Sequence, residues 1–153
     1  MDDKLITLMQ IHQMEVEYWN EVELNGGCNS TDFFVEGGTF AIDDKVMNGK
    51  EEIAAFYRWR RSLGPRVTRH LISNMHIAAD YENRATFKYV MQLFAGNGEP
   101  VLKSEPASLI ADVTDECVKV EGRWYIESRK FKSLFAGSTP ATVPNRQQIE
   151  DNR

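Results

Sequence analysis

The chain has 153 residues, a net charge of -5, and apolar and charged fractions of 42% and 27%, which together predict one globular domain with its own hydrophobic core. The basic residues are scattered, so the concentrated basic patch of a nucleic-acid-binding protein is not expected. No stretch is long and apolar enough to span a bilayer, and the acidic start at residues 1–4 is unlike a signal peptide. We therefore expect a cytoplasmic protein without a membrane partner.

The first part of the chain carries helical signals. Apolar residues recur at helical spacing over residues 3–24, and Asn25-Gly26-Gly27 is a typical helix stop. The next predicted elements, in order, are a short helical turn at residues 30–36, strands at 39–42 and 46–49, and a strong helix at 50–61. That helix places Ile53, Phe56, Tyr57 and Arg60 on one stripe. We interpret its last residues, Arg58-Trp59-Arg60-Arg61, as cations that complement the helix dipole.

After Gly64-Pro65 the apolar period changes from helical to alternating. The predicted strands are Val67–Ala78, Arg84–Phe94, Ser104–Thr114 and Trp124–Phe131, with Val118-Lys119-Val120 opening a further hairpin. Short turns between successive strands imply an antiparallel meander. The fold class is therefore α+β: a cone-shaped, curved antiparallel sheet with three N-terminal helices that enclose a pocket. We expect a single domain at residues 1–137 and a flexible C-terminal tail at 138–153, where apolar residues are few.

The strand that starts at Arg66 is the most informative segment for function. Strict alternation would place Thr68, His70, Ile72 and Asn74 on one face. A histidine and an amide among apolar residues suit the wall of a pocket. Imidazole is also the side chain best matched to proton transfer near neutral pH.

Four segments of the chain, this strand among them, resemble sequences of the nuclear transport factor 2-like superfamily, and most closely those of its SnoaL-like branch. The resemblance is carried by Glu36-Gly37-Gly38-Thr39-Phe40, by Asn48-Gly49-Lys50-Glu51-Glu52-Ile53, by Thr68-x-His70-x-Ile72-x-Asn74 and by Gly122-Arg123-Trp124-Tyr125-Ile126-x-x-Arg129. It covers about residues 5–132. The branch includes scytalone dehydratase, hexachlorocyclohexane dehydrochlorinase and polyketide cyclases, so the resemblance implies the cone fold more firmly than any one substrate.

In the dehydratase and dehydrochlorinase members, a strand histidine pairs with an aspartate near the end of the first helix. The resemblance implies that His70 is this histidine and that Glu23 takes the carboxylate position, where this chain departs from the family by one methylene. Glu23 would orient the imidazole and stabilise its protonated form, or act itself as the base. Glu21 and Asp32 are the competing carboxylates if the alignment shifts.

The remaining candidates would bind substrate, although each has a plain structural alternative. We predict that four aromatic residues either line an aromatic pocket or belong to the core: Tyr18, Trp19, Tyr57 and Tyr89. Asn74 is predicted either to form a hydrogen bond with the substrate or to end the hydrogen-bond ladder between two strands. Arg129 could hold an anionic or phenolic oxygen or form a surface ion pair. The histidines do not have the spacing of a helical metal site, so no metal and no cofactor are expected.

Together the resemblance and the residues predict a cofactor-independent lyase or isomerase that acts on a small aromatic substrate. Dehydration, elimination, and retro-aldol C–C cleavage such as formaldehyde loss from a lignin-derived diaryl diol remain open, as does a polyketide-cyclase-like aldol reaction. The alternative from another class is a non-catalytic ligand-binding or assembly module, such as a dioxygenase β subunit. The branch also implies a homodimer or homotrimer through the outer sheet face, where Leu71 and Leu109 are expected.

Overall fold

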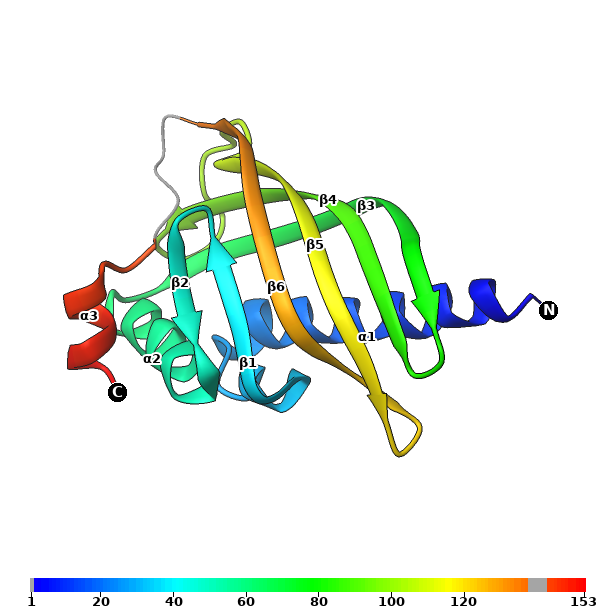
Figure 1. Cartoon of the computed structure of the whole chain (residues 1–153). Coiled ribbons are helices and arrows are strands. Elements are labelled where there is room, and N and C mark those ends of the chain that lie inside the picture. Colours follow the sequence, from blue (N-terminus) through cyan, green and yellow to red (C-terminus); the bar gives the residue numbers. More distant parts are fainter. Residues whose placement is uncertain (1, 138–142) are drawn as a thin grey trace.

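The computed structural model describes residues 2–137 and 143–153 (Figure 1). Its helices are α1 (Asp3–Asn25), the 3-10 turn η1 (Ser30–Phe33), α2 (Gly49–Ser62) and α3 (Arg146–Asp151), and its strands are β1 (Phe34–Ile42), β2 (Lys45–Asn48), β3 (Arg66–Tyr81), β4 (Arg84–Asn97), β5 (Leu109–Val120) and β6 (Arg123–Ala136). The predicted α+β class is confirmed: three helical elements precede a long meander of strands.

The strands form one sheet in the order β2-β1-β6-β5-β4-β3. From β3 to β6 successive strands pair antiparallel, as the short turns predict. One pairing differs from the prediction, because β1 lies parallel to β6, with Phe40 opposite Arg129. These two strands are separated by most of the chain, so no hairpin forces them to run in opposite directions.

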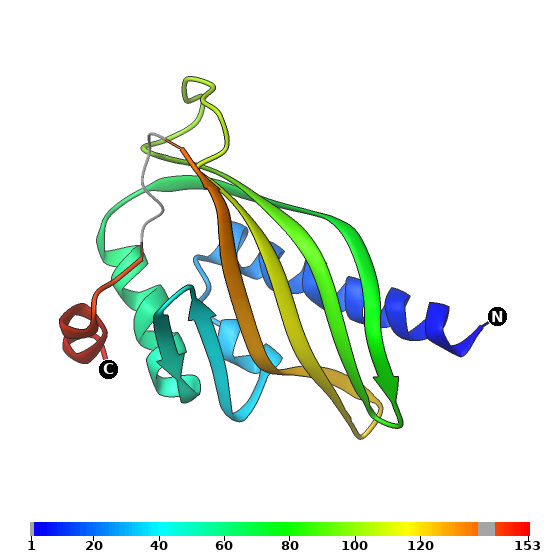
Figure 2. The same cartoon turned by 45° about the horizontal axis from the view of Figure 1, so that its top comes forward.

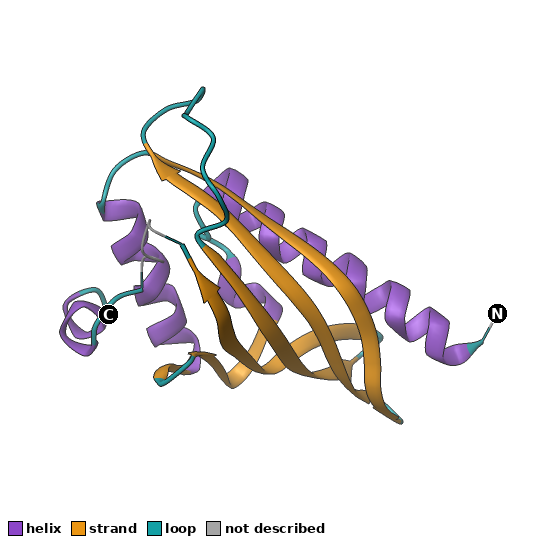
Figure 3. Cartoon of the chain, turned by 90° about the horizontal axis from the view of Figure 1, so that it is seen from above, coloured by secondary structure: helices purple, strands orange, loops and turns teal. Residues whose placement is uncertain are grey.

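The sheet is curved and open, and α1 and α2 lie across its concave side (Figures 1 and 2). Alternation along β4 sends Phe87, Tyr89, Met91 and Leu93 inward, where they are buried. Seen from above, α1 runs along the strands of the meander, and the loop that joins β4 to β5 projects beyond the sheet (Figure 3). The core therefore fills the space between the concave sheet face and the helices.

Helix α1 begins and ends where its sequence signals predict. The Asp2 side chain caps the start by accepting a bond of 2.8 Å from the Lys4 backbone nitrogen. At the other end Gly26 adopts a left-handed conformation with φ of 62°. Gly27 must also remain small, since a Cβ there would lie 2.5 Å from Cδ1 of Tyr57. The end of α1 is thereby held close to the inner face of α2.

The boundaries of β5 are a correction to the sequence prediction. We expected a strand at Ser104–Thr114 and a separate one from Val118, but a single strand covers Leu109–Val120. Pro100 and Pro106 lack backbone donors, which is unfavourable in a strand, and residues 98–108 form a loop. As the first residue of β5, Leu109 points inward and is only 5% exposed, so its expected place on the outer face is wrong, whereas Leu71 is 47% exposed.

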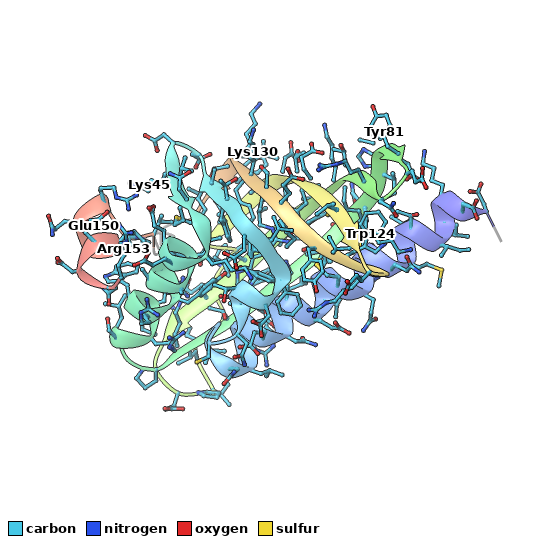
Figure 4. The ribbon with its side chains drawn as sticks, turned by 60° about the horizontal axis from the view of Figure 1, so that its bottom comes forward. Lys45, Tyr81, Trp124, Lys130, Glu150 and Arg153 are labelled. Atoms are coloured by element: carbon cyan, nitrogen blue, oxygen red, sulfur yellow. The ribbon has the colours of Figure 1, made fainter. Side chains whose placement is uncertain are left out.

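Part of the predicted flexible tail is helical. Residues 138–142 lie outside the described residues, but α3 starts with a capping box in which Asn145 and Gln148 cap each other. Ile149 is buried, Arg146 forms an ion pair of 2.7 Å with Glu52, and Arg153 reaches Glu51 and Glu150 (Figure 4). Helix α3 therefore packs on α2, through contacts that the sparse apolar pattern of the tail did not indicate.

Candidate active site

His70 and Glu23 meet where the end of α1 crosses the start of β3. The Nδ1 atom of His70 lies 3.2 Å from Oε1 of Glu23, and the His70 backbone N–H donates to the same carboxylate oxygen. Both side chains are largely buried, with 8% and 7% of their surfaces exposed. The contact that the sequence predicted between this histidine and a carboxylate is therefore present, with Glu23 in the carboxylate position.

This geometry selects a tautomer of His70. An ionised carboxylate only accepts hydrogen bonds, so Nδ1 carries the hydrogen and Nε2 is left as the acceptor. Burial lowers the pKa of the His70 imidazole, and the hydrogen bond to Glu23 opposes part of that decrease. The imidazole is therefore neutral near neutral pH, which is the state that a general base requires.

Trp19 covers one face of the His70 imidazole. Its ring stacks on His70 with centroids 4.0 Å apart and an interplanar angle of 14°. The indole Nε1–H donates to the Tyr89 hydroxyl at 3.4 Å, and that hydroxyl donates to Glu15 at 3.2 Å. His70 is thus fixed by a carboxylate at its edge and by a hydrogen-bonded indole against its face.

A small cavity of about 40 Å³ opens beside His70. Its lining comes from both helices, the sheet and the C-terminal segment: Trp19, Val22, Phe40, Ile42, Phe56, Tyr57, Arg60, His70, Met91, Leu93, Leu109, Phe131 and Val143. Most of these side chains are apolar, and His70, Tyr57 and Arg60 add polar groups to the lining. This combination is typical of a small-molecule site.

Arg60 is a site residue that the sequence reasoning missed. We assigned it to the helix dipole, although its place on the buried stripe of α2 was visible. In the structure it lines the cavity, and burial lowers the pKa of its guanidinium to about 10. The neighbouring Arg60 charge also contributes to the lowered pKa of His70. The signal that could have identified it was an arginine in register with Ile53, Phe56 and Tyr57.

Tyr57 lines the cavity, and Tyr18 lies behind it with its hydroxyl bonded to that of Tyr57. Burial raises the pKa of both phenols, that of Tyr57 to about 12. Both groups therefore remain protonated near neutral pH, and Tyr57 is a hydrogen-bond donor or acceptor within reach of the cavity. The predicted role of Tyr18 in the pocket is limited to this support, since it is not among the lining residues.

Arg129 is neither at the cavity nor at the surface. It is fully buried and donates to Asp115 at 2.7 and 3.0 Å and also to Glu15. Its guanidinium lies 4.5 Å from the ring centre of Tyr18. Burial raises the pKa of Glu15, Asp115 raises it further, and Arg129 opposes both effects. A proton on Glu15 makes the cluster of one guanidinium and two carboxyl groups electrically neutral.

Asn74 is not on the face that simple alternation predicts. The β3–β4 register shifts between Ser73 and His76, and Asn74 has a left-handed φ of 55°. It lines a groove with outward-facing residues such as Lys88 and Lys130, away from the His70 cavity. The bulge reverses the direction of the following side chains, so Asn74 does not contribute to this cavity.

The residues that carry the two competing carboxylates, Glu21 and Asp32, make contacts with residues other than His70. Glu21 accepts from the side chain of Asn25 at 2.9 Å and from the Asn29 backbone at 2.7 Å. Asp32 belongs to η1, where its backbone oxygen is 3.4 Å from Arg123.

Within residues 2–137 and 143–153, no group of three or more His, Cys, Asp or Glu side chains could hold a metal ion. In the same ranges, every helix is too short or too polar to cross a membrane.

The chain belongs to the SnoaL-like domain family, whose profile matches residues 30–130. The match covers more than half of the chain and includes His70, whereas Glu23 precedes it. A search of curated protein sequences gave no significant match.

Solved structures support the same fold. A protein from Novosphingobium aromaticivorans DSM 12444 that is assigned as a scytalone dehydratase is 21% identical, with a TM-score of 0.78 over 95% of this chain and 96% of that one. A protein from the same organism assigned as the β subunit of an aromatic-ring-hydroxylating dioxygenase is 13% identical, with a TM-score of 0.75 over 94% and 100%. A Catenulispora acidiphila protein in complex with S-DNPA is 15% identical, with a TM-score of 0.71 over 83% and 94%. At these identities the likeness concerns the fold, which both ligand-binding proteins and subunits share.

Proposed function

We propose that this protein is a cofactor-independent lyase or isomerase that acts on a small aromatic molecule. The observation that carries the proposal is the buried pair of His70 and Glu23 beside an aromatic-lined cavity. A buried, neutral imidazole oriented by a carboxylate is costly to maintain in a protein that only binds a ligand, and it is the arrangement that proton abstraction requires.

His70 is the proposed general base. Its Nε2 takes a proton from a carbon or a hydroxyl of the substrate, while Glu23 holds the Nδ1–H and stabilises the imidazolium that forms. The Tyr57 hydroxyl, which remains protonated, donates to a leaving group or a developing oxyanion. Dehydration, elimination and retro-aldol cleavage all begin with this proton transfer.

Among these reactions, retro-aldol loss of formaldehyde from a lignin-derived diaryl diol suits the aromatic lining. Removal of the hydroxyl proton lets the oxygen form the carbonyl of formaldehyde as the C–C bond breaks. The electron pair of that bond moves to the carbon next to the aromatic ring, and this carbon then takes up the proton that His70 removed from the hydroxyl, which regenerates the neutral imidazole. The same proton transfer in a substrate with a good leaving group gives elimination instead.

The test is turnover of a panel of aromatic alcohols, halides and diaryl diols by wild type, His70→Ala and Glu23→Gln. Loss of the general base should lower kcat by roughly 10²- to 10⁴-fold, and loss of the carboxylate should have a smaller effect. Tyr81→Phe is a matched control, because this exposed tyrosine is the last residue of β3 and does not line the cavity (Figure 4). Full turnover in both site variants would reject the mechanism and favour a non-catalytic binding or assembly module.

The homo-oligomer remains a prediction, to be checked by light scattering.

A further inference from the structure

Tyr89 was expected to line the pocket, but it is not among the residues around the cavity beside His70. It comes from β4 and only 2% of its surface is exposed. Its hydroxyl accepts a bond of 3.4 Å from the indole N–H of Trp19, and the Trp19 ring stacks on His70. The same hydroxyl donates to Glu15 at 3.2 Å. Tyr89 is therefore one hydrogen bond and one ring contact away from the proposed general base.

Helix α1 presents three of the side chains involved at intervals of about one turn. Glu15, Trp19 and Glu23 are spaced four residues apart, so they lie along one side of the helix. Glu15 is fully buried and accepts from Tyr89. Glu23 accepts from His70. The bond between Tyr89 and Glu15 thus holds α1 on the sheet in the register at which Trp19 and Glu23 both meet the imidazole.

The far end of this chain of contacts is anchored by Arg129, Glu15 and Asp115, which we call the inner cluster. Arg129 donates to the Glu15 oxygen that also accepts from Tyr89, and to Asp115 at 2.7 and 3.0 Å. No part of these three side chains is exposed. Hydrogen bonds from a guanidinium to carboxyl groups are short and directional, so Glu15 is a fixed acceptor for the Tyr89 hydroxyl.

The contact with Glu23 does not by itself fix the plane of the His70 ring. The second side-chain torsion of histidine is broad, so the ring can tilt while its Nδ1–H remains bonded to the carboxylate. The Trp19 ring, with its centroid 4.0 Å away and its plane inclined by 14°, restricts that tilt. Among the described residues, Tyr89 is the only hydrogen-bond acceptor for the indole N–H, so this bond determines how the indole is turned.

We propose that Tyr89 is a positioning residue for the general base. Its hydroxyl holds the Trp19 indole at the angle that keeps the His70 ring in plane with Glu23 and its Nε2 directed to the cavity. The catalytic meaning of this inference rests on the proposed lyase function, but its test follows the His70 ring itself and does not require turnover.

The experiment compares wild type, Tyr89→Phe, Trp19→Phe and the double variant by NMR. Two protons are followed with their rates of exchange with water: the indole N–H of Trp19 and the Nδ1–H of His70. Tyr89→Phe should shift the indole signal and accelerate the exchange of both protons roughly tenfold or more, because a weaker contact opens more often. Tyr125→Phe is the matched control, since it removes a hydroxyl from a half-buried tyrosine of β6 that contacts Arg123 and does not line the cavity.

The double variant tests whether Tyr89 acts through Trp19. Trp19→Phe removes the N–H that Tyr89 accepts, so adding Tyr89→Phe should change the exchange of the His70 proton by less than about twofold. On a substrate that wild type turns over, Tyr89→Phe should lower kcat about tenfold and leave KM nearly unchanged, since the lining of the cavity is intact. Circular dichroism checks that each variant is folded.

Several results would overturn the proposal: an indole signal that Tyr89→Phe leaves unchanged, His70 exchange no faster than in Tyr125→Phe, or effects of the two single changes that multiply in the double variant. A His70 Nδ1–H that is too short-lived to detect in wild type would do the same. Faster exchange of amide protons throughout the chain would also overturn it, because that indicates general loss of stability.

The two proposals fail in different ways. Full turnover in His70→Ala rejects the lyase mechanism and leaves the NMR results on Tyr89 and Trp19 standing. Turnover that depends on His70, combined with His70 exchange that Tyr89→Phe does not change, rejects the positioning role alone.

Discussion

Two buried clusters in this protein pair a nitrogen base with carboxyl groups, yet their surroundings differ. His70 lines a cavity, and a small part of its side chain and of the Glu23 side chain is exposed. Arg129, Glu15 and Asp115 are fully buried, with Tyr18 and Trp19 against the guanidinium. In the first cluster the base is a neutral imidazole that can accept a proton, whereas the guanidinium of Arg129 remains charged.

The comparison separates a reactive pair from a structural one. Accessibility to a ligand, rather than the presence of an ion pair, distinguishes them. The two clusters are also connected, because Glu15 accepts from Tyr89, Tyr89 accepts from Trp19, and Trp19 stacks on His70. The inner cluster therefore positions the indole ring that stacks on His70, the proposed general base.

The largest effect is expected for Arg129→Met. The change leaves two carboxyl groups buried without their cation, which should lower the free energy of unfolding by roughly 3 to 5 kcal/mol. Urea denaturation measures this loss, and Arg84→Gln at an exposed pair should change stability by less than about 0.5 kcal/mol. Equal stability of the two variants would mean that the buried cluster is not structural.

A smaller effect is expected for Glu23→Gln. The amide oxygen can still accept from Nδ1, so the ring stays in place while the negative charge is lost. The pKa of His70, already lowered by burial, should fall further, because the imidazolium loses its negatively charged partner. NMR titration of the His70 ring protons measures the shift, with His76 as the exposed internal control. An unchanged titration would show that the two groups do not interact in solution.

The lowered pKa of His70 also predicts how stability depends on pH. The unfolded chain takes up the proton first as the pH falls, because its histidine has the ordinary pKa of about 6.5. The contribution of neutral His70 is therefore complete above about pH 6.5 and is lost as the pH falls through the folded-state pKa. Denaturation between about pH 7.5 and about pH 5.5 should show wild type losing stability relative to His70→Gln. Parallel profiles for the two proteins would contradict this assignment.

The smallest effect is expected for Glu15→Gln. Burial raises the pKa of Glu15 and so favours its protonated form, and glutamine replaces that form with a neutral group of similar shape. The free energy of unfolding should change by about 1 kcal/mol or less, as measured by the same urea denaturation. A loss as large as that of Arg129→Met would mean that Glu15 is ionised and that the inner cluster carries a net negative charge.

Local patterns were sufficient to predict much of the fold. The first helix, the change to alternating strands after Gly64 and the position of His70 follow from periodicity and turn residues. The choice of Glu23 depended on the family resemblance, since no local pattern relates the end of α1 to the start of β3.

Other features depend on contacts that a linear pattern does not contain. The bulge near Asn74 reverses alternation without a glycine or proline to mark it, and the parallel pairing of β1 with β6 joins distant segments. Arg129 was expected to hold a substrate oxygen or form a surface ion pair and lies in a buried one, whereas Arg60 was expected to complement the helix dipole and lines the cavity. An arginine on an apolar stripe can pair inside the core or face a cavity. Only the partners that the fold supplies decide between these two outcomes.

Val143 lines the cavity beside His70, and its position has a consequence for the rate of ligand binding. A cavity that admits benzene measures about 150 Å³, whereas this one measures about 40 Å³. An aromatic ring therefore enters only when a wall residue moves. Among the described residues that line the cavity, Val143 alone follows the last strand in the chain, on the segment leading to α3. Ring binding then has two steps, and its observed rate should level off at high ligand concentration at the rate of opening. The ion pairs that hold α3 against α2 would in that case limit how fast this protein binds and releases a ligand.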